Sequence, residues 1–502
     1  MNNSLAQENP NNPNSERNRW VALVVLCVGM LMIVLDATIV NVALPSIQDD
    51  LGFSQSSLAW VVNAYLIAFG GLLLLAGRLG DLVGRRSVFL VGLTVFTLAS
   101  LACGLADSQE VLVVARFIQG VGGALTSAVI LGMIVTMFPE PSEQAKAIGV
   151  YSFVASAGGS IGLLLGGVLT EAISWHWIFF VNLPIAVVTG LLALRLLRKD
   201  RGLGLSQGAD VPGALLIVAA LMIGVYAIVE VPNYGWGSLH TLGFGAGALA
   251  LFAAFVVREM RAAQPLVPLG IFRSRNLAGA NVIQSLMVAG MFGMFFLGAL
   301  FLQRVLGFDS LEVGLAYLPV TGLIGLLSLG FSAKLNMRFG PRATLLPGLV
   351  LIGAGLLYLS QISVGGSYWS EVLPAMVLIG GGAGLSFPSL MSLAMGGVAP
   401  QEAGLASGLV NTSLQVGGAL GLAVLATLAT NRTADLTTSG DSTAQALTSG
   451  YQLAFLIAAG LVAVAVAVAA FVLEPVAAPQ AQTEEGVEAP ELPEPAFSSE
   501  AV

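Results

Sequence analysis

Long apolar stretches alternate with short polar segments along the chain from Trp20 to Leu473. At a rise of about 1.5 Å per residue, a helix of about twenty residues crosses the hydrocarbon core of a bilayer, and most of these stretches are that long. The pattern therefore predicts an all-α integral membrane protein with fourteen transmembrane helices. We expect the helices near residues 20–44, 57–76, 87–106, 110–138, 145–172, 176–197, 211–231, 239–257, 277–303, 311–333, 343–362, 371–395, 403–430 and 451–473.

The positions of the basic residues support this count. With the N-terminus inside, seventeen of the eighteen Lys and Arg residues in loops fall on the cytoplasmic side, and Arg432 is the external one. Cytoplasmic loops of membrane proteins are typically rich in Lys and Arg. We therefore expect a multi-pass protein of the cytoplasmic membrane with both termini in the cytoplasm.

The chain also contains an internal repeat. Several residues of segment 78–86 recur 256 residues later in segment 334–342, and several of segment 147–162 recur 259 residues later in segment 406–421. The nearly constant offset indicates two parallel repeats of six helices, related by an axis along the membrane normal.

The two spans between the repeats have no counterpart and few polar groups, so we interpret them as linker helices that separate the bundles and lie outside any pathway through the protein. The predicted domains are a cytoplasmic polar tail (1–19), an N-terminal six-helix bundle (20–200), two linker helices with a cytoplasmic connection (201–275), a C-terminal six-helix bundle (276–473) and a disordered acidic cytoplasmic tail (474–502).

Composition excludes an ordinary soluble domain. The chain is 56% hydrophobic and 10% charged, with a mean hydropathy of +0.88, whereas soluble domains carry about 25% charged residues. The net charge of −8 says little about partners, because the tail beyond Phe471 holds seven glutamates and no base. Cys27 and Cys103 lie in apolar runs without CxxC spacing, which indicates neither a disulfide framework nor a metal site.

Asp36 is the one ionisable group in the apolar run from Trp20 to Leu44. A carboxylate deep in a membrane helix costs at least ~2.5 kcal/mol on insertion scales, so it indicates a function unless a neighbouring helix merely satisfies it. Arg116 in the fourth span also needs a buried partner, and Asp36 is the candidate. From the helical positions we expect Asp36 to face a central cavity and Asn41 to hold neighbouring helices together.

Four motifs resemble those of a known family. They are Leu35-Asp36 to Pro45, Gly77 to Arg86, Arg116 to Ala124, and Trp175 to Pro184. Over about residues 20–473 the chain is similar to the fourteen-helix drug:proton antiporters of the major facilitator superfamily. The resemblance implies the superfamily fold, with two six-helix bundles plus two inserted helices, and proton-coupled export by alternating access. The chain differs from the family pattern at Leu82 and Leu163, where a basic residue and a proline are usual.

The second motif predicts a latch on the cytoplasmic side. Gly84 permits a tight turn, and the two arginines after it can anchor to the inner leaflet. The resemblance implies that Asp81 faces a helix start near Glu402, and that Arg85 and Glu140 complete a charge network when the inner side closes. A loop that only sets topology is the alternative. The gating-loop residues are Gly77, Arg78, Asp81, Gly84, Arg85, Arg86 and Glu140.

The fifth span carries Gly158, Gly162 and Gly166 at every fourth position, a stripe that allows close helix packing. We expect this stripe and Gly167 to form an interface at which the two bundles move. Helix packing without such a role is the alternative explanation of the stripe.

Polar, methionine and aromatic side chains inside other spans are candidates for the wall of a substrate cavity, because Met and Phe surfaces accept varied apolar ligands. Ordinary helix contacts are the alternative. The candidates are Asn41, Asn63, Tyr65, Gln119, Asn281, Gln284, Met287, Met291, Phe295, Asn411 and Gln415.

The sequence thus predicts a monomeric exporter, not an enzyme, that uses the proton gradient and no cofactor. Asp36 would take a proton from outside and release it inside, because desolvation favours the neutral acid and an approaching Arg116 favours the carboxylate. We expect lipophilic small molecules, protons and membrane lipids as partners, and no nucleic acid. An exporter of an endogenous lipophile is the first alternative. A membrane-embedded transferase is the second, but it would need converging ionisable groups that the spans lack.

Overall fold

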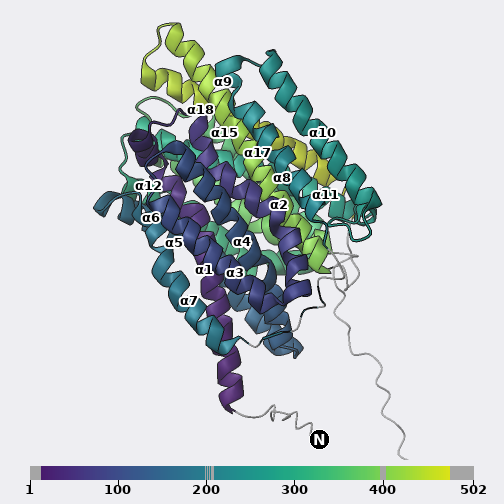
Figure 1. Cartoon of the computed structure of the whole chain (residues 1–502). Coiled ribbons are helices and arrows are strands. Elements are labelled where there is room, and N and C mark those ends of the chain that lie inside the picture. The colour runs from purple at the N-terminus through teal and green to yellow at the C-terminus, as the bar shows by residue number, and fades with distance from the viewer. Residues whose placement is uncertain are drawn as a thin grey trace, which may run out of the picture.

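The computed structural model describes residues 13–197, 199–200, 202, 204, 209–395 and 403–474. Within these residues every regular element is a helix, and the long helices run side by side (Figure 1). The predicted acidic tail beyond Glu474 and the predicted helix start at Glu402 lie outside the described residues.

The first half opens with a helix of 39 residues that begins within the predicted polar tail. The sixth predicted span is two helices, which meet at Val181. The elements of this half are α1 (Pro13–Leu51), η1 (Ser57–Ala59), α2 (Trp60–Val83), α3 (Arg85–Gly104), α4 (Gln109–Met137), α5 (Pro141–Ala172), α6 (Trp177–Phe180) and α7 (Asn182–Leu196).

The linker and the second half follow. The linker elements are α8 (Val211–Val229), α9 (Val231–Tyr234), α10 (Leu239–Arg261) and η3 (Leu269–Arg273). The second half consists of α11 (Arg275–Arg304), α12 (Ser310–Ala316), α13 (Leu318–Leu326), η4 (Leu327–Phe331), α14 (Ser332–Phe339), α15 (Pro341–Leu359), η5 (Tyr368–Val372), α16 (Leu373–Met395), α17 (Ala403–Thr438) and α18 (Thr443–Phe471).

Within the described residues, twelve helices are long and apolar enough to cross a membrane. The other two predicted spans, 145–172 and 311–333, coincide with α5 and with the run from α12 to α14. Their apolar parts, Ile161–Ala172 and Ser310–Leu326, are shorter. The second run is interrupted at Tyr317 and by the π-helical turn η4, a wider winding that breaks the regular hydrogen-bond ladder. The count of fourteen stays a prediction.

The predicted repeat is visible in the backbone. Gly84 joins α2 to α3 with φ +101°, and its counterpart Gly340 joins α14 to α15 with φ +85°. Residues with a Cβ rarely adopt such φ values, so glycine at both positions makes the same tight turn possible.

The helices form two packed groups. In the first, α1 packs against α4, α5 and α7, and α4 against α2 and α3; in the second, α11 packs against α17 and α18, and α15 against α16 and α18. The groups meet where α2 contacts α17, α1 contacts α11, and α5 contacts α12 and α13. Helix α8 touches both α2 and α17, while α10 lies outside it at the edge of the molecule (Figure 1). The linker pair therefore bridges the two groups.

The molecule has two distinct ends. We call the end at which α1 begins the proximal end and the end at which α1 finishes the distal end. The turn from α17 to α18 projects at the distal end, opposite the N-terminus (Figure 1).

Candidate functional site

A buried ion pair lies inside the first group of helices. Arg116 on α4 donates from Nη1 to Asp36 Oδ2 on α1 over 2.6 Å, and both side chains are almost completely shielded from solvent. Arg116 also donates from Nε to the Val61 carbonyl of α2 over 2.9 Å. The pairing predicted from the sequence is therefore present, and it ties three helices together.

Further donors surround the Asp36 carboxylate. Gln119 Nε2 and Asn182 Nδ2 donate to Asp36 Oδ1 over 2.7 and 2.9 Å. Gln119 also donates to Ser100 Oγ on α3 over 2.8 Å and accepts from Arg116 through Oε1 over 2.6 Å. A buried charge is tolerated when it is paired and hydrogen-bonded, and this network meets both conditions.

Asp36 does not face the cavity, contrary to the expectation from helical positions. Asp36 points toward α4 and α7, whereas Asn41 lines the cavity and donates to the carbonyls of Ala37 and Thr38 in its own helix. Positions five apart on a helix differ by about 140°. The two side chains therefore had to diverge, but the sequence did not indicate which one faced inward.

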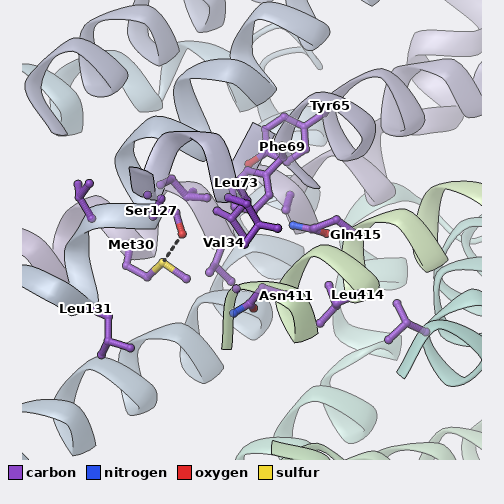
Figure 2. Close-up of a pocket in the computed structure, with 18 of the residues that line it drawn as sticks. Met30, Val34, Tyr65, Phe69, Leu73, Ser127, Leu131, Asn411, Leu414 and Gln415 are labelled. Atoms are coloured by element: carbon purple, nitrogen blue, oxygen red, sulfur yellow. Dashed lines mark hydrogen bonds between the residues drawn. The ribbon is translucent and has the colours of Figure 1, made fainter. Parts of the chain in front are cut away.

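A cavity of about 950 Å³ lies between the two groups of helices. It extends from Asn41 and Tyr65 at mid-depth to Asp81 and Arg85 at the proximal end. Figure 2 shows cavity-lining side chains of α2, including Phe69, close to Gln415 of α17. The wall is mostly apolar with a few polar groups, the usual character of a small-molecule site.

The cavity candidates divide into two sets. The structure places Asn63, Gln119, Asn281, Gln284 and Met287 elsewhere in the protein interior, where all are buried. Of these, Gln119 belongs to the ion-pair network and Asn281 bonds Leu277 and Ser413. The candidates in the cavity wall are Asn41, Tyr65, Met291, Phe295, Asn411 and Gln415.

Tyr65 separates the ion pair from the cavity. Its ring lies 4.4 Å from the guanidinium carbon of Arg116, within the range of a cation–π contact. The same side chain lines the cavity. A movement of Arg116 can therefore alter the cavity wall, and a ligand in the cavity can alter the ion pair.

The distal end is closed by contacts between the two groups. Gln303 Nε2 donates to the Val42 carbonyl over 3.0 Å, and Arg304 forms an ion pair with Asp49. Helix α5 also contacts α12 closely, because a Cβ at Gly167 of α5 would lie 2.6 Å from the Ser310 carbonyl oxygen of α12. The cavity is thus sealed distally and reaches the gating loop proximally.

The gating loop lines the proximal part of the cavity. Arg85 pairs with Asp81 over 3.1 Å and donates to the Gly132 carbonyl over 2.8 Å; within the described residues Glu140 is not its partner. Gly77, Arg78, Asp81 and Arg85 all line the cavity. In the described part of the chain the predicted network with Glu140 is not formed in this conformation, and Glu140 is exposed at the start of α5.

The glycine stripe of α5 packs within one group, not between groups. A Cβ at Gly158 would meet Val34 at 3.1 Å, one at Gly162 would overlap Thr38 Oγ1, and one at Gly166 would meet the Ile39 carbonyl at 2.6 Å. All three contacts are with α1. Gly167, on an adjacent face, is the member that meets the other group.

Sequence reasoning missed several residues of these sites. Asn182 and Ser100 complete the ion-pair network. Asn182 lies in the fourth motif but was not identified as a site residue, and Ser100 is a polar position in an apolar span. Asp200 accepts the N–H groups of Arg85 and Arg86 over 2.6 and 3.2 Å and so satisfies the start of α3. Asp200 lies more than a hundred residues after the start of α3 in the sequence, so no local sequence pattern could indicate that it bonds there.

A transport family accounts for this combination of two helix groups, a central cavity and a buried ion pair. The family model described as Major Facilitator Superfamily matches residues 26–422. The chain belongs to the Major Facilitator Superfamily. It is accordingly a transporter and not an enzyme, and its apolar helices are those of a multi-pass membrane protein.

Relatives of this superfamily transporter bear resistance and export names. It is 41% identical over 449 residues to the puromycin resistance protein pur8 of Streptomyces alboniger, covering 88% of this chain and 89% of that one. It is 37% identical over 420 residues to the tetracenomycin C resistance and export protein of Streptomyces glaucescens, covering 83% and 77%. The cephamycin export protein CmcT of Amycolatopsis lactamdurans is 38% identical over 449 residues, covering 89% and 91%.

Solved structures support the superfamily fold. A bacterial homologue of the human lysosomal transporter Spinster, in an inward-facing and unoccupied conformation, has a TM-score of 0.65 at 17% identity and covers 90% of this chain and 96% of its own. An autoinhibited peptide transporter of the POT family has a TM-score of 0.63 at 17% identity, with coverage of 89% and 96%.

Proposed function

We propose that this transporter exports lipophilic drugs or toxic compounds in exchange for protons, by alternating access. The observation that carries the proposal is the buried Asp36–Arg116 pair, which lies one aromatic ring away from a large, mostly apolar cavity. The resistance and export names of the relatives support the direction of transport.

The mechanism assigns the proton to Asp36. A protonated Asp36 can still accept hydrogen bonds from Gln119 and Asn182, but it no longer provides a counter-charge for Arg116. Because Tyr65 lies against Arg116, a displaced Arg116 alters the cavity wall, and a substrate that displaces Tyr65 alters the ion pair. Such coupling is reciprocal: the ligand weakens proton binding as much as the proton weakens ligand binding.

The membrane arrangement is part of the proposal. We place the proximal end and both termini in the cytoplasm, with α5 and the run from α12 to α14 completing fourteen spans. Cysteines introduced at Ser4 and at Asp441 should then react oppositely with an impermeant thiol reagent added outside intact cells. Equal reaction at both positions would exclude this arrangement.

Uptake into inside-out vesicles tests the proposed function. We expect a fluorescent lipophilic cation such as ethidium to accumulate when the vesicle lumen is acidic, and to stop accumulating when the proton gradient is collapsed. Accumulation that needs the protein but is indifferent to the gradient would contradict proton coupling.

The names of the relatives also support a second candidate. Relatives named for export of tetracenomycin C and of cephamycin favour a cargo that the cell itself makes. Metabolites in the medium of cells with and without this protein distinguish the two, because an endogenous cargo disappears from the medium when the protein is absent.

A further inference from the structure

Two buried carboxylates lie together at the proximal end of the linker helices. Asp210 immediately precedes α8 and Glu259 lies in the last turn of α10, and each is only 3% exposed. The segment that follows α10, residues 262–268, we call the strap. Its members Gln264, Pro265, Leu266 and Pro268 line the proximal part of the cavity.

One oxygen of each carboxylate is fully engaged. Asp210 Oδ1 accepts from the Gly213 N–H over 3.1 Å and from Arg258 Nε over 3.0 Å. Glu259 Oε2 accepts from the Val267 N–H over 2.9 Å and so binds the strap directly.

Among the residues that the structure describes, the other oxygen of each carboxylate has no hydrogen-bond partner. Asp210 Oδ2 and Glu259 Oε1 are both buried and unsatisfied there. Both lie against Gly213, where a Cβ would be 2.5 Å from the first and 2.9 Å from the second. They are therefore neighbours, in a space that exists because residue 213 has no side chain.

A proton shared between Asp210 Oδ2 and Glu259 Oε1 would satisfy both buried oxygens. Two like charges in one buried site cannot both ionise without a large cost, and Arg258, the one cation paired with them in the described part of the chain, balances only one of them. A protonated carboxyl supplies an O–H donor that satisfies the other carboxylate. We propose that Asp210 and Glu259 form a proton-binding carboxyl–carboxylate pair that ties the strap to α8 at the mouth of the cavity.

The surroundings make the strap responsive to this proton. Leu266 and Val267 of the strap pack in an apolar cluster with Leu75 of α2 and Leu409 of α17. Among the described residues, the charged groups on the packed elements include Arg258 and Arg261 on α10 and Arg78 and Asp81 on α2. Arg258 pairs with Asp210, and Arg78 donates to Gln264 over 3.5 Å. When the proton leaves, the two carboxylates repel each other, the Glu259–Val267 bond is strained, and the strap is released from contact with both helix groups.

Labelling of the strap tests the proposal on the full-length protein. A cysteine at Leu266, a buried position of the strap, is treated with an impermeant thiol reagent in detergent at a series of pH values. The labelling rate of this strap cysteine is divided by the labelling rate of a cysteine at Ser439, an exposed distal position. This ratio corrects for the effect of pH on thiol ionisation. Cys27 and Cys103 are buried, and the parent protein gives their background.

We expect the rate ratio to rise several-fold as the pH increases in the otherwise unaltered protein. In Glu259→Gln the amide N–H replaces the shared proton, so the ratio should remain low at every pH. The matched control is Glu230→Gln at the distal end of α8, which should behave like the parent. A ratio independent of pH in the parent, or an unchanged pH dependence in Glu259→Gln, would overturn the proposal.

Infrared spectroscopy provides a test that does not depend on the strap. Among the described residues the buried acids are Asp36, Asp210 and Glu259. In Asp36→Asn protein at neutral pH we expect the carbonyl band of a buried protonated carboxylic acid, and its loss on adding Glu259→Gln. Absence of that band in Asp36→Asn protein overturns the proposal even if the double variant fails to fold. Neither assay measures transport, so failure of the carboxyl pair is distinct from failure of the proposed function.

Discussion

At the scale of single residues, Tyr65 has the most consequential position. One side of its ring contacts the Arg116 guanidinium, and the side chain also forms part of the cavity wall. Within the described residues its buried hydroxyl oxygen has no hydrogen-bond partner, so the contacts of Tyr65 with Arg116 and the cavity are made by its ring.

Substitutions at Tyr65 should separate the contribution of its ring from that of its hydroxyl. Tyr65→Phe keeps the ring and should retain proton-coupled uptake within about twofold, since a hydroxyl without a partner contributes little. Tyr65→Ala removes a cation–π contact of about 0.5–2 kcal/mol and opens the cavity to the ion pair. We expect it to bind substrate but to take up several-fold less per proton exchanged. The same loss in both variants would show that the hydroxyl, and not the ring, transmits the coupling.

The ion pair itself could be predicted from single residues, and its surroundings could not. An acid and an arginine in apolar spans each require a buried partner, so the sequence alone predicts that Asp36 and Arg116 pair. Ser100 carried no comparable signal, because a polar uncharged side chain in a membrane helix is often satisfied by its own backbone. Asn182 belonged to the fourth motif, but the motif did not indicate its partner. The linker acids were also missed, since Asp210 and Glu259 lie at helix ends, where exposure is the normal expectation.

At the scale of helices, the glycine stripe of α5 sets how closely α5 approaches α1. Its period was evident in the sequence, but period alone does not reveal which neighbour a stripe faces. The structure shows that Gly158, Gly162 and Gly166 face α1, while Gly167 faces α12. The stripe therefore fixes one group internally, and the adjacent face of α5 makes the contact that must break when the distal end opens.

Gly162→Leu should abolish transport by forcing α5 away from α1. A Cβ there would overlap Thr38 Oγ1 and lie 2.9 Å from the Leu35 carbonyl oxygen, and overpacking of this kind costs about 1–3 kcal/mol or more. The matched control is Gly159→Ala, whose Cβ would approach Thr38 Cγ2 no closer than 4.0 Å. Thermal unfolding in detergent and vesicle uptake measure the two effects. Full uptake by Gly162→Leu would mean that α1 and α5 can separate without loss of function.

At the scale of the whole molecule, contacts between the two groups close the distal end, and the cavity extends to the gating loop at the proximal end. The repeat and the tight turn at Gly84 followed from sequence, and the same turn at Gly340 agrees with the repeat. The conformational state did not follow from sequence, because the same sequence must be compatible with both states of an alternating-access cycle. The linker pair was predicted to be a spacer, yet α8 contacts both groups and the strap lines the cavity.

Arg304→Gln should shift the equilibrium away from the distally closed state. Its ion pair with Asp49 is partly exposed and contributes up to about 1 kcal/mol, which corresponds to a several-fold change in population. Spin labels at Ser54 and Leu315, on opposite groups at the distal end, should show a larger fraction of long distances. Arg432→Gln, also exposed and distal, is the control and should leave the distribution unchanged. An unchanged distribution in Arg304→Gln would mean that this pair does not hold the distal end closed.

The central claim is that Asp36 carries the proton that drives transport. Its most direct test is the pH change in lightly buffered, reconstituted vesicles when ethidium is added. We predict that wild-type protein releases protons on substrate addition. Asp36→Asn, which mimics the neutral acid and keeps hydrogen-bonding partners, should bind ethidium yet release none and support no uphill uptake. If Asp36→Asn exchanges protons for ethidium at the wild-type rate, Asp36 is not the proton carrier and the proposed mechanism is wrong.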